Sequence, residues 1–177
     1  MKTWRWFGPP ARKGSSVNGN RCCKNGETWL INCFISNGCL RIYRFGNDGR
    51  EHTFRFGVDT RWVTDVESYK LKKPSLFDIE ALAASTVLIW TKAKWTALML
   101  TIPVLKEFQE TLMANSSEAS QRRIYSLTSS SAEEKYIEFQ KTYPSVFNRV
   151  TFHMGASYLG VSRETVSRLR KSFTTHR

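Results

Sequence analysis

Residues 152–173, FHMGASYLGVSRETVSRLRKSF, decide the fold of the C-terminal part of this chain. Apolar residues recur at i, i+4 and i+7 at the start of the stretch: Phe152, Ala156 and Leu159. This spacing predicts a helix with one buried stripe, which Gly160 ends. Ser162 has a hydroxyl suited to cap a second helix that begins at Arg163. Two short helices joined by such a turn form a helix-turn-helix.

The second helix of this motif has an apolar face and a polar face. Three apolar residues recur at i, i+3 and i+7 and should be buried: Val166, Leu169 and Phe173. On the other face, arginine can donate two hydrogen bonds to guanine, glutamate can accept one from cytosine, and serine and lysine can contact phosphates. The predicted DNA-binding residues are Ser162, Arg163, Glu164, Ser167, Arg168 and Lys171. The alternative is an ordinary solvated face in a protein that never touches nucleic acid.

Four segments of the chain resemble Crp/Fnr-type bacterial transcription regulators. Residues 162–168, SRETVSR, resemble the start of their recognition helix, and residues 156–161, ASYLGV, resemble the preceding helix and turn. Residues 131–150 resemble the segment that joins the effector domain to the DNA-binding domain. Residues 38–67 resemble the β-roll.

The resemblance implies an α+β fold with a partial cyclic-nucleotide-binding-like β-roll, a long connecting helix and a C-terminal helix-turn-helix domain of the winged-helix type. It also implies a sequence-specific DNA-binding transcription regulator that works as a homodimer on double-stranded DNA. Relatives with this recognition sequence read TGTGA-like half-sites, and RNA polymerase is a candidate further partner. One alternative is an inactive remnant whose β-roll acts only as an interaction module.

The expected β-roll covers residues 27–102. Segments 38–45 and 50–57 are rich in Ile, Tyr, Phe and Thr, and the turn sequence Gly46-Asn47-Asp48-Gly49 between them is typical of a β-hairpin. Residues 86–90 predict a further, buried strand.

Helices should follow the roll. Thr91 could cap a short helix, and Pro103 fits the first turn of a long connecting and dimerisation helix over residues 103–130. Its expected apolar stripe consists of Val104, Leu105, Phe108, Leu112, Ala119, Ile124 and Leu127. A polar patch at residues 115–118 weakens the case for a continuous dimer seam. Ser131 and Glu134 then predict a capping box that opens the helix-turn-helix domain, residues 131–177.

Residues 1–26 show neither strand nor helix periodicity, although they contain Trp4, Trp6 and Phe7. We expect this segment to be unstructured or altered, because the opening strands of the roll are not recognisable. A truncated or frame-altered start and a divergent but folded start are both compatible with the sequence.

The effector of such a regulator cannot be named from these residues. Relatives that bind cyclic nucleotides use a glycine-and-glutamate loop followed by an arginine on the cyclic phosphate. The corresponding residues 63–69 and 74–76 lack both the glycine and the arginine, so cyclic AMP is not expected to bind. Glu67 is expected to be a solvated acid, and the cofactor-binding residues are unknown.

Charge and composition fit a regulator. The net charge is +12, and residues 1–26 and 121–177 contribute +6 each, which leaves a neutral middle. A neutral sensor beside a basic C-terminal part suits a polyanion-binding protein. No apolar run approaches the ~18 residues of a membrane span and no secretory signal is evident, so we expect a cytoplasmic protein without a membrane partner.

No cofactor, metal site or catalytic activity is expected. Four cysteines lack paired metal-ligand spacing and should remain reduced thiols: Cys22, Cys23, Cys33 and Cys39. The competing class is a cupin-like metal enzyme, which would need two or three clustered histidines and a carboxylate. The roll offers only His52, and a lone histidine on a strand is usually a surface residue.

Overall fold

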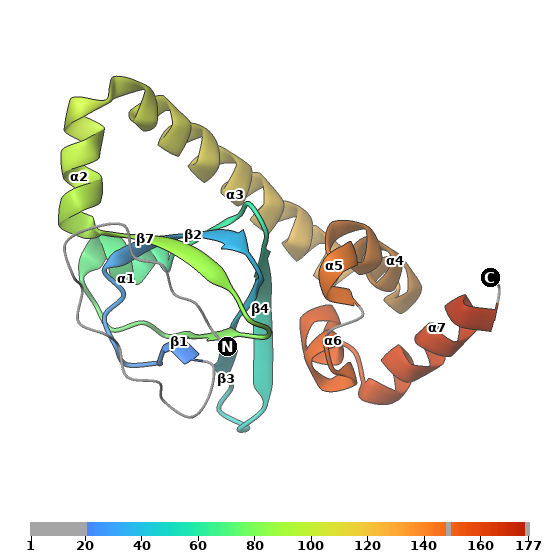
Figure 1. Ribbon diagram of the computed structural model, residues 1–177. Helices are drawn as coiled ribbons and strands as arrows, with labels where there is room; N and C mark the ends of the chain where they lie inside the picture. The colour runs from blue at the N-terminus through green and yellow to red at the C-terminus, as the bar shows by residue number, and fades with distance from the viewer. Residues whose placement is uncertain (1–20, 148–149, 176–177) are drawn as a thin grey trace. The chain divides into compact units, whose positions relative to one another are not determined.

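The structure, a computed structural model, describes residues 21–147 and 150–175 (Figure 1). These residues belong to two compact units: the first comprises the residues up to Lys92 together with Val150, and the second comprises the other residues from Ala93 onward. The first unit contains the strands and the second the long helices, which confirms the expected α+β fold. None of the helices within the described ranges is long and apolar enough to cross a membrane.

The first unit consists of two antiparallel sheets and one short helix. The four-stranded sheet has the order β1-β6-β3-β4, and the three-stranded sheet has the order β5-β2-β7. The strands are β1 (Arg21–Cys23), β2 (Ile31–Asn37), β3 (Cys39–Phe45), β4 (Glu51–Val58), β5 (Trp62–Val63), β6 (Asp78–Ala81) and β7 (Thr86–Thr91). Helix α1 (Val66–Leu71) lies between β5 and β6 in sequence.

The predicted hairpin is confirmed as β3 and β4. The amide of Gly46 donates to the carbonyl of Arg50 at 2.9 Å, and the amide of Gly49 donates to that of Gly46 at 3.0 Å. Gly49 adopts a φ of 74°, a conformation that side chains disfavour, which explains the glycine at this turn position. The predicted strand at residues 86–90 is also confirmed, as β7.

A hydrophobic core lies between the two sheets. The four-stranded sheet contributes Leu40, Ile42, Ile79 and Ala81, and the three-stranded sheet contributes Cys33, Ile35, Val63 and Val87. All eight are at most 5 % exposed. Side chains alternate along each strand, so one face of each sheet reaches this core.

The expectation of an unstructured segment up to residue 26 is wrong for its last six residues. Strand β1 pairs with β6, and Cys23 is buried in the core. A three-residue strand is too short to produce a recognisable alternation, so the pattern could not reveal it. Residues 1–20 lie outside the described part, and the expectation for them stays a prediction.

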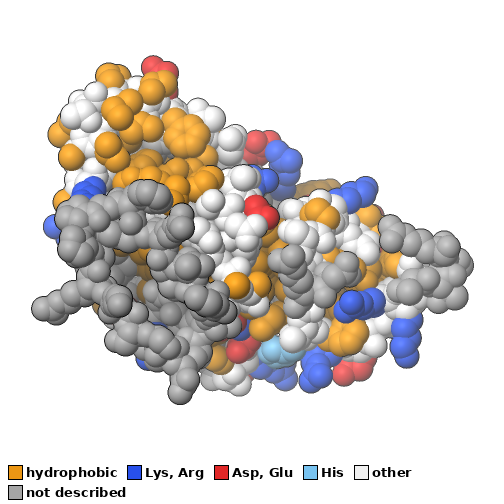
Figure 2. All heavy atoms as spheres, viewed as in Figure 1, with side chains coloured by type: hydrophobic (Ala, Val, Ile, Leu, Met, Phe, Trp, Pro, Cys, Tyr) orange, Lys and Arg blue, Asp and Glu red, His pale blue; other side chains and the backbone are white. Residues whose placement is uncertain are grey.

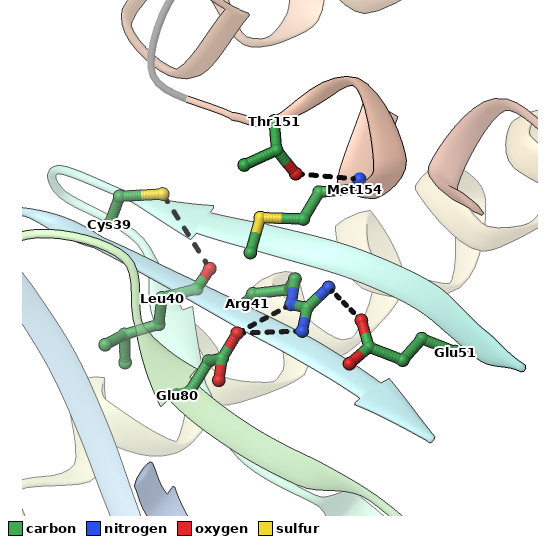
Figure 3. A network of polar contacts seen from close by, with 7 residues as sticks. All are labelled: Cys39, Leu40, Arg41, Glu51, Glu80, Thr151 and Met154. Carbon is green, nitrogen blue, oxygen red and sulfur yellow. Dashed lines mark hydrogen bonds and ion pairs between the residues drawn. The ribbon is translucent and has the colours of Figure 1, made fainter. Parts of the chain in front are cut away.

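Arg41 on β3 is a buried charge in the four-stranded sheet. Its guanidinium lies between two carboxylates, 2.8 Å from Glu51 and 2.8 Å from Glu80 (Figure 3). It also lies 3.9 Å from the ring centroid of Tyr43. Because an unpaired buried charge is costly, these partners allow the side chain to be only 2 % exposed.

All the regular secondary structure in the described residues of the second unit is helical. Its helices are α2 (Lys92–Thr101), α3 (Pro103–Ser129), α4 (Ala132–Thr142), α5 (Pro144–Phe147), α6 (Phe152–Leu159) and α7 (Arg163–Thr175). The long helix starting at Pro103 is confirmed, and so is the capping box, in which Ser131 and Glu134 exchange hydrogen bonds. The strands of a wing are not among the described residues of this unit, so that detail stays a prediction.

The residues of the apolar stripe expected along α3 differ in exposure. Leu105 and Leu112 are half-buried, whereas Val104 and Phe108 are 63 % and 43 % exposed. Positions 104, 105, 108 and 112 fall within an arc of about 100° around the helix axis, which is the usual width of an apolar stripe. Val104 and Phe108 therefore form an exposed part of this stripe.

Candidate nucleic-acid interface

Helices α6 and α7 form the predicted helix-turn-helix, with local capping at each boundary. The amide of Met154 donates to the Thr151 hydroxyl at 3.2 Å, which begins α6. Gly160 ends α6 with a φ of 67°. The amide of Thr165 then donates to the Ser162 hydroxyl at 3.1 Å, so Ser162 caps α7 as expected. These bonds satisfy amides and carbonyls that helix ends leave without partners.

The apolar face of α7 packs within the domain. Val166 is 5 % exposed, Leu169 is half-buried, and the ring of Phe173 stacks on Tyr136 at 5.4 Å between centroids. This packing fixes how α7 is rotated about its own axis. The polar face must therefore point away from the domain core.

The expected burial of Phe152 is wrong, because its side chain is 40 % exposed. It lies in the first turn of α6, and the guanidinium of Arg170 is 5.3 Å from its ring centroid. The same guanidinium is 6.0 Å from the ring of Phe147. Arg170 thus belongs to the packing of the domain.

The structure brings the predicted DNA-binding residues together at the start and on one face of α7. Five are exposed and Ser167 is half-buried; the exposed ones are Ser162, Arg163, Glu164, Arg168 and Lys171. Figure 2 shows Lys and Arg side chains over α7. The five members within α7, residues 163, 164, 167, 168 and 171, fall within an arc of about 140° around the helix axis. Their role in DNA binding stays a prediction.

Glu164 is held in its charged form. Hydrogen bonds from its own backbone amide and from the Ser162 hydroxyl, together with the charge of Arg163, lower the pKa of its carboxyl group. A carboxylate at the N-terminus of a helix also interacts favourably with the helix dipole. At neutral pH Glu164 therefore presents only acceptor atoms, as contact with a cytosine amino group requires.

Residues that the sequence analysis did not single out form the core of the domain that carries this interface. An aromatic cluster holds α4, α5 and α6 together, with ring centroids 5.1–5.7 Å apart; it consists of Tyr136, Phe139, Tyr143, Phe147 and Tyr158. The i, i+3, i+7 spacing of Tyr136, Phe139 and Tyr143 was a signal for part of it. Arg123 on α3 contacts Tyr158, and no local sequence pattern predicts that contact.

The second candidate site is the loop around α1, which includes residues 63–69 and 74–76. Asp65 caps α1 by accepting from the amide of Ser68 at 3.2 Å. Its other oxygen accepts from the Ser75 hydroxyl at 2.6 Å. The carboxylate of Asp65 therefore lies at the N-terminus of α1, the position that a bound anion would take. Glu67 is exposed, as expected.

A metal centre finds no support among the described residues. Within residues 21–147 and 150–175, no group of three or more His, Cys, Asp or Glu side chains is placed to hold a metal ion. His52 is a surface side chain, 3.8 Å from the carboxylate of Asp48. The four cysteines are free thiols.

Comparison with known proteins supports the fold. No family model and no curated protein sequence matches the chain. Among solved structures, FixK2 from Bradyrhizobium japonicum is 15% identical with a TM-score of 0.76, over 89% of this chain and 81% of that one. A CRP-family transcriptional regulator from Thermus thermophilus is 13% identical with a TM-score of 0.69, over 90% and 83%. The c-di-GMP responsive global regulator CLP of Xanthomonas campestris is 13% identical with a TM-score of 0.68, over 89% and 84%.

Proposed function

We propose that this chain, which has the fold of Crp/Fnr-type regulators, is a sequence-specific DNA-binding transcription regulator that reads the major groove with α7. The observation that carries the proposal is the exposed polar face of a capped helix whose opposite face is locked into the domain. An α-helix fits the major groove, where each base pair presents a distinct set of donors and acceptors.

The residues of this face have different roles in the proposal. Arg163, Glu164 and Arg168 contact base edges, because arginine and glutamate carry the bidentate donor and the acceptor that guanine and cytosine require. The phosphate contacts come from Ser162, Ser167 and Lys171. Ser162 can contact a phosphate while capping α7, because its oxygen accepts from the Thr165 amide and its one hydroxyl hydrogen, which bonds to Glu164 in the free chain, can turn to the phosphate.

Selection from a pool of randomised DNA duplexes tests the proposal. The full chain should enrich one inverted repeat, and a variant with Arg163→Ala and Arg168→Ala should enrich none. Enrichment of no sequence by the wild-type chain, or of the same sequence by the double variant, would refute base reading by α7.

We also propose that a second copy of this chain covers the exposed apolar residues of α2 and α3. Figure 2 shows hydrophobic side chains gathered over α2 and the start of α3. The exposed large ones there are Leu100, Ile102, Val104 and Phe108. One recognition helix contacts too few base pairs for specific binding, whereas a two-fold dimer places two of them on an inverted repeat.

Cyclic AMP and cyclic GMP are not expected to raise DNA affinity. The Asp65 carboxylate already satisfies the amide end of α1 and the Ser75 hydroxyl. A cyclic phosphate at this place would meet the like charge of the Asp65 carboxylate. Calorimetric titration should show no binding of either nucleotide at micromolar concentration; measurable heat with saturation would refute this part of the proposal.

The closed α1 loop also favours a second candidate, a DNA-binding protein whose β-roll has lost effector control. Both candidates predict the same DNA contacts, no catalysis and a cytoplasmic protein. For a regulator with effector control, some small molecule from a cell extract should change the affinity for DNA; for the second candidate, none should. RNA polymerase is a candidate partner of the regulator alone.

A further inference from the structure

The last turns of α3 make three polar contacts within the second unit, two with α4 and one with α6. The Ser126 hydroxyl donates to Glu138 of α4 at 2.6 Å. The ammonium group of Lys135 on α4 donates to the carbonyl of Leu127 at 3.0 Å. The guanidinium of Arg123 donates to the backbone carbonyl of Tyr158, in the last turn of α6.

Arg123 makes the contact nearest to the recognition helix. Besides its hydrogen bond, the guanidinium lies 3.6 Å from the ring centroid of Tyr158, at cation–π distance. The Tyr158 carbonyl is one of the last four of α6, which lack partners within the helix and carry its partial negative charge. One side chain of α3 therefore grips both the backbone and the ring at the C-terminal end of α6.

The turn between α6 and α7 lies against the same part of α3. A Cβ placed on Gly160 would be 3.4 Å from a methyl group of Leu127. Tyr158 itself is 8 % exposed, and its ring packs on Phe139 of α4 at 5.1 Å between centroids. The end of α6 is thus enclosed by α3 and α4, and only two residues separate Gly160 from the first residue of α7.

We propose that Arg123 is a positioning residue that fixes the direction of α7 relative to the long helix α3. The inference rests on the proposed function, because direction matters only if α7 enters a groove. We call the contact of Arg123 with Tyr158 the clamp. In a dimer held together through α3, the clamp sets the separation of the two recognition helices and therefore the half-site spacing that both can reach. The free protein then has its reading helices in place without an effector.

The test measures spacing preference with Arg123→Ala. Duplexes carry the inverted repeat selected by the wild-type chain, with its native spacing or with one or two base pairs inserted at the centre. A matched control is Arg122→Ala, which removes the same charge one residue away, where the guanidinium pairs with the exposed Glu118 on the same helix. Arg123→Lys is the conservative variant, because an ammonium group can also donate to a carbonyl and lie over a ring.

The wild-type chain and Arg122→Ala should prefer the native spacing by about tenfold or more, as rigidly linked recognition helices do. Arg123→Ala should lose most of that preference while its affinity for a single half-site stays within about twofold, and Arg123→Lys should restore part of it. A general structural defect would instead lower half-site and full-site affinity together. Unchanged spacing preference in Arg123→Ala would overturn the proposal.

A second measurement separates failure of the clamp from failure of the proposed function, since it uses no DNA. Residual dipolar couplings of backbone amides in the deuterated full chain report the directions of α3 and α7. In the wild type one alignment tensor should fit both helices, and in Arg123→Ala the couplings of α7 should shrink relative to those of α3. One shared tensor in Arg123→Ala would refute the clamp, whatever the chain does with DNA.

Discussion

Arg168 is the single residue whose loss should be most informative about base reading. It is exposed on the polar face of α7, opposite the buried Val166. A bidentate arginine–guanine contact contributes about 1–3 kcal/mol of discrimination, so Arg168→Ala should weaken binding to the selected site by that amount and relax specificity at one base position. Fluorescence anisotropy on the selected duplex and its single-base variants measures both quantities.

The control for this substitution is Lys141→Ala, which removes one positive charge from an exposed position on α4. It should weaken binding to every duplex equally and only slightly, because it changes a nonspecific attraction to phosphates. If Arg168→Ala behaved like Lys141→Ala across all sequences, Arg168 would be a phosphate contact and not a base contact.

Two cysteines illustrate how burial controls a side chain in the roll. Burial raises the pKa of the Cys33 thiol to about 12 and that of Cys23 to about 11. Since the thiolate is the reactive species, neither residue should be alkylated by iodoacetamide at pH 8 in the native protein. Mass spectrometry after alkylation should find Cys22, which is only half-buried, modified first. Native modification of Cys33 at the rate of Cys22 would contradict the packing.

The turn between α6 and α7 depends on one backbone conformation. Gly160 has a φ of 67°, which costs a residue with a side chain about 1–2 kcal/mol, except that asparagine tolerates it better. Gly160→Ala should therefore lower the free energy of unfolding by about that amount in urea denaturation. Gly160→Asn, which places the same Cβ near Leu127, should cost less. Equal losses would assign the effect to contact with Leu127 and not to φ.

Elements that carry their own start and stop signals were predictable from the sequence. Ser131, Gly160 and Ser162 act on amides and carbonyls within four residues, so their effect can be read along the chain. The hairpin of β3 and β4 was predictable for the same reason. Where a residue's environment comes from a distant segment, as for the exposed Phe152 beside Arg170, the local pattern was misleading.

The candidate site was predictable from the sequence where its residues follow a local helical pattern. The sequence placed all six DNA-binding candidates at the start or on the polar face of α7, because helical periodicity alone determines that face. It could not reveal Arg123, which lies 35 residues before its partner Tyr158. Nor could it reveal the ion pairs of Arg41, whose carboxylate partners come from two other strands.

The state of association of the whole molecule follows from the apolar surface of α2 and α3. Val104 is 63 % exposed, so replacing it with glutamate should leave the fold of one protomer intact. In a dimer the same change removes apolar burial from both copies and buries two charges. At about 1.5 kcal/mol for each lost side chain, the dimer dissociation constant should rise about a hundredfold or more.

Sedimentation velocity over a range of micromolar concentrations checks this expectation, with Lys106→Glu as the control. Lys106 is exposed on α3 but lies 200° around the helix from Val104, so its replacement places the same new charge on another face. The wild type and Lys106→Glu should sediment as dimers, and Val104→Glu as a monomer. Because two recognition helices must bind together, Val104→Glu should also lose preference for the inverted repeat over a single half-site. A monomeric wild type that still distinguishes the inverted repeat would show that α3 does not form the interface and that two-fold binding arises elsewhere in the chain.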